Sequence, residues 1–153
     1  MLKLNEKVQN FELLDEEGKT FKLYEQKKPL LLVFYPGDDT PVCTAQLCDY
    51  RDGIQEFRDL EIQVIGISKD SIVSHQNFKK KYNLPFPLLS DPDGKVADSF
   101  GCKTLLGTIN RAVFLLNANQ ELLWYHKETL SMFHRTKKEL IEIIQKFKKE
   151  NKI

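Results

Sequence analysis

The chain has 153 residues, of which 41% are hydrophobic, and its 23 Lys and Arg residues nearly balance its 22 Asp and Glu residues. This composition is typical of a folded globular protein and excludes the disordered and low-complexity classes. The net charge of +1 lacks the basic excess of an electrostatic nucleic-acid binder. We therefore expect one domain over residues 1–153 that does not bind nucleic acid.

A buried strand followed by a helix is predicted in the first third of the chain. Residues 30–35 form a continuous apolar run bounded by turn formers, which is typical of a strand buried on both faces. Thr40 before Pro41 then marks the start of a helix. Apolar residues recur behind it at a spacing that lines one helix face. They are Cys43, Leu47, Tyr50, Ile54 and Phe57, whereas Cys48 falls on the polar face.

The middle of the chain alternates between extended and helical patterns. A second buried strand, a helix, a short extended piece, a turn and a brief helix are predicted. In chain order they occupy residues 62–67, 71–82, 85–89, 91–94 and 96–100.

The last third of the chain predicts a hairpin and a helix. Residues 111–116 and 121–125 read as two strands joined by a hairpin-type connection. Thr136 and Glu139 have the spacing of a capping box, with an apolar helix face behind them. This order of elements predicts an α/β fold with a central mixed β-sheet flanked by helices.

Two features bear on the location of the protein. The longest apolar run, residues 30–35, is far shorter than the ~20 residues of a membrane-spanning helix, and residues 1–11 lack the apolar core of a secretory signal. Three cysteines are too few, and odd in number, for a secreted disulfide scaffold. We therefore expect a cytoplasmic protein without membrane partners, in which the default for each cysteine is a buried thiol.

Cys43 is the candidate nucleophile. It lies in the first turn of a predicted helix, at the carboxyl end of a buried strand, and open α/β sheets bind ligands at that edge. A free thiol, with a pKa of about 8.5, is only about 3% thiolate at pH 7. The unpaired N–H groups of a helix start favour the anion and lower that pKa. Position alone therefore nominates Cys43.

The stretch around Cys43 resembles the active-site signature of the peroxiredoxins, thiol-dependent peroxidases on a thioredoxin-like fold. Pro36, Thr40 and Cys43 carry the signature, and Arg111 matches the arginine that completes the site in that family. A second cysteine five residues after the first, here Cys48 after Cys43, resembles the pattern of the bacterioferritin-comigratory-protein, or peroxiredoxin Q, branch of the family. Taken singly, Thr40 could be only a helix cap, Pro36 only a strand end and Arg111 only a surface charge.

The resemblance extends from residue 8 to residue 147 and implies a reaction. Cys43 would attack the terminal oxygen of a hydroperoxide and become a sulfenic acid, while Thr40 and Arg111 hold the peroxide oxygens. Pro36 would pack over the sulfur. The resemblance requires no cofactor. His75, His126 and His134 share no ligand-like spacing with the cysteines, so we expect no metal.

The resemblance also implies that Cys48 resolves the sulfenic acid as a Cys43–Cys48 disulfide, which thioredoxin or a similar dithiol then reduces. Five residues along a helix place two Cα atoms about 8.7 Å apart, but a disulfide tolerates at most ~7 Å. Residues 43–50 must therefore unwind in every cycle if Cys48 resolves. Cys102 stays open as the alternative resolving residue.

Three other functions stay open at this point. A one-cysteine peroxidase would use an external thiol as its resolver. A thiol-disulfide oxidoreductase on the same fold normally presents Cys-x-x-Cys, which this chain lacks. A non-catalytic binding or holdase module would keep the fold and not need Cys43. A monomer is favoured, with a dimer as the alternative.

Overall fold

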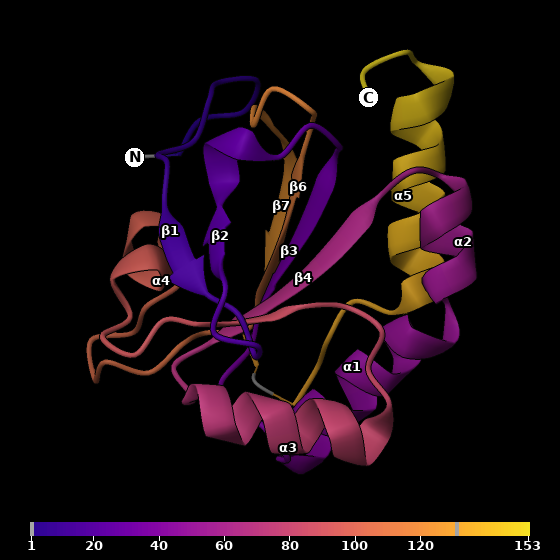
Figure 1. Ribbon diagram of the computed structural model, residues 1–153. Helices are drawn as coiled ribbons and strands as arrows, with labels where there is room; N and C mark the ends of the chain where they lie inside the picture. The colour runs from indigo at the N-terminus through magenta and orange to yellow at the C-terminus, as the bar shows by residue number, and fades with distance from the viewer. Residues whose placement is uncertain (1, 131) are drawn as a thin grey trace.

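A seven-stranded mixed sheet lies at the centre of the protein, as the computed structural model shows (Figure 1). The structure describes residues 2–130 and 132–153. The spatial order of the strands is β2-β1-β5-β4-β3-β6-β7. Their bounds are Glu12–Leu14 (β1), Thr20–Lys22 (β2), Leu30–Phe34 (β3), Gln63–Ser68 (β4), Leu88–Ser90 (β5), Ala112–Leu116 (β6) and Leu122–Lys127 (β7).

Helices cover both faces of this sheet. Figure 1 shows α4 on one side, and α5 together with α2 on the other. The α-helices are Pro41–Asp52 (α1), Ile54–Asp59 (α2), Ile72–Tyr82 (α3), Lys95–Ser99 (α4) and Lys137–Lys149 (α5), and a 3-10 helix spans Leu23–Glu25. Within the described residues, none of the helices is long and apolar enough to cross a membrane.

The central strand β3 separates two hydrophobic cores. It pairs in parallel with β4 and antiparallel with β6, and all five of its residues are buried, which confirms the predicted buried strand. Because alternate side chains of a strand point to opposite faces, Leu32 and Phe34 enter one core and Leu31 and Val33 enter the other. The first core is closed by α4, and the second by α1, α2, α3 and α5.

The fold class predicted from the sequence is confirmed, and the capping box is too. The Thr136 hydroxyl accepts a hydrogen bond from the Glu139 amide at 3.2 Å, and the Glu139 carboxylate accepts one from the Thr136 amide at 3.4 Å. The terminal hairpin of β6 and β7 is antiparallel, as expected. The extended piece expected at residues 85–89 forms a strand only from Leu88 to Ser90.

One predicted helix is wrong in extent. The apolar stripe from Cys43 to Phe57 belongs to two helices, which meet at Gly53. A side chain at Gly53 would meet the Lys137 side chain, with Cβ only 2.8 Å from Cδ of that lysine. Any larger residue here would have to displace the Lys137 side chain at the start of α5, and glycine is itself a poor helix former. The chain also forms a short hairpin of β1 and β2, which the sequence analysis did not predict.

Candidate active site

Cys43 occupies the third position of α1, just beyond the end of β3. Thr40 is the N-cap residue, and its carbonyl accepts a hydrogen bond from the Thr44 amide at 2.8 Å. The Cys43 residue is 1% exposed and belongs to the core that α1 and α5 close. The sulfur is therefore placed at a helix start, where backbone N–H groups lack intrahelical partners, and is nevertheless almost sealed from solvent.

Arg111 brings a positive charge to this sulfur from a distant part of the chain. It directly precedes β6, and the pairing of Ala112 with Phe34 places it beside the end of β3. Its Nη1 donates hydrogen bonds to Cys43 Sγ at 3.3 Å and to Gln46 Oε1 at 2.6 Å. Arg111 is only 3% exposed, so it is not a surface charge. A fixed donor and a permanent charge thus face the candidate nucleophile.

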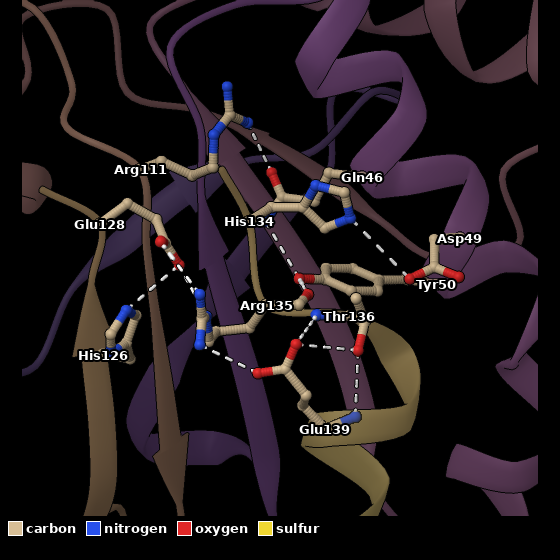
Figure 2. Close-up of polar contacts among 10 residues, drawn as sticks. All are labelled: Gln46, Asp49, Tyr50, Arg111, His126, Glu128, His134, Arg135, Thr136 and Glu139. Carbon is tan, nitrogen blue, oxygen red and sulfur yellow. Dashed lines mark hydrogen bonds and ion pairs between the residues drawn. The ribbon is translucent and has the colours of Figure 1, made fainter. Parts of the chain in front are cut away.

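Gln46 is a site residue that the sequence analysis missed. It is buried, lies one helical turn after Cys43, and its Nε2 donates to the Tyr50 hydroxyl at 3.1 Å. The Tyr50 hydroxyl in turn donates to the Arg135 carbonyl at 2.5 Å, and burial raises the pKa of Tyr50. Figure 2 shows this chain of contacts between α1 and the segment before α5. A polar residue at helical spacing on an otherwise apolar face was the available signal.

A second set of contacts ties the carboxyl half of α1 to the start of α5. The Asp49 carboxylate accepts a hydrogen bond from the Lys137 amide at 2.8 Å. Arg135, just before α5, forms ion pairs with Glu128 at 3.0 Å and with Glu139 at 2.9 Å (Figure 2). The end of α1 is thus attached to backbone groups that the Arg135 ion pairs hold in place.

Thr40 and Pro36 are exposed residues of the segment between β3 and Cys43. Thr40 caps α1 without a side-chain cap bond, and its hydroxyl donates instead to the Gly37 carbonyl at 3.1 Å. Pro36 is exposed and lies between β3 and α1. The structure therefore brings Thr40, Cys43 and Arg111 to one end of β3, with Arg111 in direct contact with the sulfur.

The other two cysteines lie in different surroundings, and all three are free thiols. Cys48 is partly exposed on α1, and partial burial raises the pKa of its thiol. Cys102 is 1% exposed, its Sγ donates to the Ala97 carbonyl at 3.4 Å, and burial raises its pKa to about 12. Cys102 belongs to the core on the α4 side of the sheet, whereas Cys43 belongs to the opposite core.

One group of described residues has the composition of a metal site. Ligand atoms of Asp38, Asp70 and His75 all lie within 4.8 Å of one another. Each carboxylate already accepts hydrogen bonds from protein groups, and His75 Nδ1 lies 2.7 Å from Asp38 Oδ2. The His75 side chain is fully buried. We interpret the group as a hydrogen-bond network.

Residues 4–125 match the model of the AhpC/TSA family. Peroxiredoxin Bcp of Bacillus subtilis is 38% identical over 131 residues, which cover 80% of this chain and 83% of that protein. The chloroplastic peroxiredoxin Q of Oryza sativa subsp. japonica is 44% identical over 113 residues, covering 72% of this chain and 52% of that protein. The chain thus spans about half the length of such chloroplastic relatives.

Among solved structures, that of peroxidoxin BcpB from Mycobacterium tuberculosis is similar over nearly the whole chain. The match covers 97% of this chain and 98% of that one, with a TM-score of 0.84 and 29% sequence identity. The fold, the family model and the relatives all indicate the same family. The chain therefore belongs to the AhpC/TSA family, the peroxiredoxins, and within it to the branch of the Bcp and peroxiredoxin Q proteins.

Proposed function

We propose that this protein is a thiol-dependent peroxidase that reduces hydrogen peroxide and organic hydroperoxides, with Cys43 as the nucleophile. The observation that carries the proposal is the 3.3 Å contact between Arg111 Nη1 and Cys43 Sγ at a helix start. A donor that is fixed before the reaction stabilises charge as it moves onto the leaving oxygen. Family membership supports the same reaction.

In the first step the Cys43 thiolate attacks the terminal oxygen of the hydroperoxide. An S–O bond forms, the O–O bond breaks, and the leaving oxygen takes up a proton to become water or an alcohol. Sulfur is oxidised by two electrons to the sulfenic acid, and the peroxide is reduced by two. Arg111 is the donor to the peroxide oxygens, Thr40 holds the peroxide from the exposed side, and Pro36 limits the access of water.

In the second step we assign Cys48 as the resolving residue. Its thiol attacks the Cys43 sulfenic acid, a disulfide forms, and water leaves. Cys48 is partly exposed on the helix that carries Cys43, whereas Cys102 is sealed on the opposite side of the sheet. A bond to Cys102 would require part of the central sheet to open, but a bond to Cys48 requires only that α1 unwind.

The proposed cycle closes with an external dithiol such as thioredoxin, which reduces the Cys43–Cys48 disulfide. We also propose a cytoplasmic location, since three free thiols suit a reducing compartment. We propose that the protein is a monomer, with a dimer as the alternative. Size-exclusion chromatography with light scattering, on reduced and oxidised protein, distinguishes the two.

The test is a thioredoxin-coupled peroxide assay on wild type, Cys43→Ser, Cys48→Ser and Cys102→Ser. We expect no turnover from Cys43→Ser, loss of coupled turnover but intact oxidation of Cys43 in Cys48→Ser, and wild-type turnover from Cys102→Ser. Turnover by Cys43→Ser at the wild-type rate contradicts the proposal. Mass spectrometry after one equivalent of peroxide should show a Cys43–Cys48 linkage. A Cys43 adduct in its place would favour the one-cysteine peroxidase.

A further inference from the structure

One peptide group in the loop before α1 is held from both sides. The Asp38 amide donates to Asp70 Oδ2 at 2.9 Å, and the Gly37 carbonyl of the same peptide accepts from the Thr40 hydroxyl at 3.1 Å. The chain contains no cis peptide among the described residues. In a planar trans peptide the N–H and the C=O point in opposite directions. Fixing the amide on Asp70 therefore fixes the carbonyl that orients Thr40.

Asp70 is itself held firmly by the end of the sheet. The Ser68 hydroxyl, in the last residue of β4, donates to Asp70 Oδ2 at 2.5 Å, and the Asp70 amide donates back to Ser68 Oγ at 3.2 Å. The Ser90 hydroxyl, at the end of β5, donates to the Asp70 carbonyl at 2.6 Å. Both strands are parallel neighbours inside the sheet, so Asp70 is attached to the ends of two inner strands.

The Asp38 side chain anchors the same loop to α3. Its carboxylate, 3% exposed, accepts from the Tyr35 hydroxyl at 2.7 Å and from Ser74 Oγ at 2.8 Å, and lies 2.7 Å from His75 Nδ1. The other ring nitrogen of His75 faces the Leu89 carbonyl at 2.9 Å. The His75 ring thus joins the Asp38 carboxylate to the backbone of β5. Burial raises the pKa of Tyr35 well above its usual value, with the charge on Asp38 adding to the effect, so the phenol stays a donor.

We propose that Asp70, together with the Asp38–His75 pair, positions Thr40 for the peroxide reaction by fixing the Gly37–Asp38 peptide. This inference rests on the proposed function. A hydroxyl has one proton and two lone pairs. With its proton committed to the Gly37 carbonyl, the Thr40 oxygen presents lone pairs that accept the O–H of a hydroperoxide. Neither Asp70 nor His75 touches the substrate; both act through the peptide.

A double-mutant cycle tests this positioning. The quantity measured is the second-order rate constant for oxidation of Cys43 by hydrogen peroxide, in wild type, Thr40→Val, Asp70→Ala and the double variant. We expect Thr40→Val to lower it about 100-fold, as loss of one preorganised hydrogen-bonding group does elsewhere, and Asp70→Ala to lower it about tenfold. In the Thr40→Val background Asp70→Ala should change it by less than about twofold, because no hydroxyl is left to position.

Two further measurements separate positioning from general damage. Alkylation of Cys43 by iodoacetamide, which does not use the Thr40 hydroxyl, should keep its wild-type rate in Asp70→Ala. Asp70→Asn retains an acceptor for the Asp38 amide and should recover most of the peroxide rate. Asp98→Asn, an exposed carboxylate on α4, is the matched control and should behave as wild type. If Asp70→Ala does not fold, Asp38→Asn replaces it in the cycle with the same expected non-additivity.

The results distinguish failure of this inference from failure of the proposed function. If Asp70→Ala lowers the rate equally in both backgrounds, or leaves it unchanged while wild type reacts rapidly, only the positioning role is overturned. If wild type reacts with peroxide no faster than Cys43→Ser, the proposed function fails, and the positioning role fails with it.

Discussion

The loop at residues 36–40 and the helix α1 that follows it are held by different kinds of contact. The loop is anchored through Asp38, whose carboxylate is 3% exposed and faces the fully buried His75. The far end of α1 is anchored by the buried Tyr50 and by Asp49 at the rim, which bind backbone groups at the start of α5. The Asp49 side chain is 27% exposed. A low local dielectric strengthens the buried contacts of the loop, whereas water competes with the Asp49 contact at the rim of α1.

This difference matches what the proposed cycle demands of the two regions. The loop presents the same groups to every peroxide, so it benefits from rigidity. The helix must unwind over residues 43–50 before Cys48 can reach Cys43, and it then exposes Leu47 and Tyr50. Exposing a large apolar side chain costs about 1.5–3 kcal/mol. Water can replace the Asp49 contact, so breaking that contact adds little to this cost. The comparison teaches that the rigidity of the loop before Cys43 and the release of the helix after it depend on different residues.

The largest effect is expected at Arg111, which contacts Cys43 and, through Gln46, the body of α1. In Arg111→Met the sulfur loses its donor and its neighbouring charge. We expect the rate constant for oxidation of Cys43 by peroxide to fall about 10²–10³-fold. Arg111→Lys keeps a charge without the planar fork, so its rate constant should lie between those of wild type and Arg111→Met. Stopped-flow oxidation measures this effect, and a loss below about threefold would contradict the assigned role.

Amide hydrogen exchange sharpens the comparison directly. In the oxidised protein we expect protection over residues 43–50 to fall about 100-fold or more, because those amides lose their helical partners. The Asp38 amide, bound to Asp70, should keep its protection in both redox states. Mass spectrometry of deuterated peptides from reduced and oxidised samples measures both. Equal protection of residues 43–50 in the two states would rule out the unwinding step.

Tyr50→Phe tests whether the buried hydroxyl contact at the end of α1 restrains the helix. The variant loses the hydroxyl that joins Gln46 to the Arg135 carbonyl, and we expect the free energy of unfolding to fall by about 1–2 kcal/mol. Formation of the Cys43–Cys48 disulfide should accelerate about fivefold, while peroxide oxidation of Cys43 changes little. Tyr125→Phe removes an exposed hydroxyl as the control. Slower disulfide formation would show that the contact does not restrain α1.

The smallest effect is expected at the exposed end of the loop. Asp39 bonds Lys81 Nζ at 3.0 Å and the Tyr82 hydroxyl at 3.0 Å, and these bonds lower the pKa of its carboxyl. A lowered pKa stabilises the fold above the ordinary value of about 3.9, and the effect is lost as the pH falls below it. Asp39→Asn should therefore lower Tm slightly at pH 7 and not at pH 2. Exposed ion pairs contribute little to stability. A large loss of Tm at pH 7 would therefore show that the Asp39 bonds are among the main anchors of the loop.

Several features of the fold follow from local sequence alone. The run at residues 30–35, the Thr40–Pro41 helix start and the capping box at Thr136 are specified by residues close in the chain, and the structure contains all three. The hairpin of β1 and β2 escaped prediction because its strands have only three residues each. The break at Gly53 escaped too, since the apolar spacing continues unchanged from α1 into α2.

The sequence by itself determined the nucleophile candidate, because a cysteine in the first turn of a helix after a buried strand is a local pattern. Only the tertiary structure decided the surroundings of that cysteine. Arg111 reaches the sulfur across 68 residues, and His75 reaches Asp38 across 37. The physical reason is the strand order β5-β4-β3-β6, which brings distant chain segments to one edge of the sheet and leaves Cys102 on the opposite face from Cys43. Periodicity identifies which residues are buried, but the pairing of strands decides which of them meet.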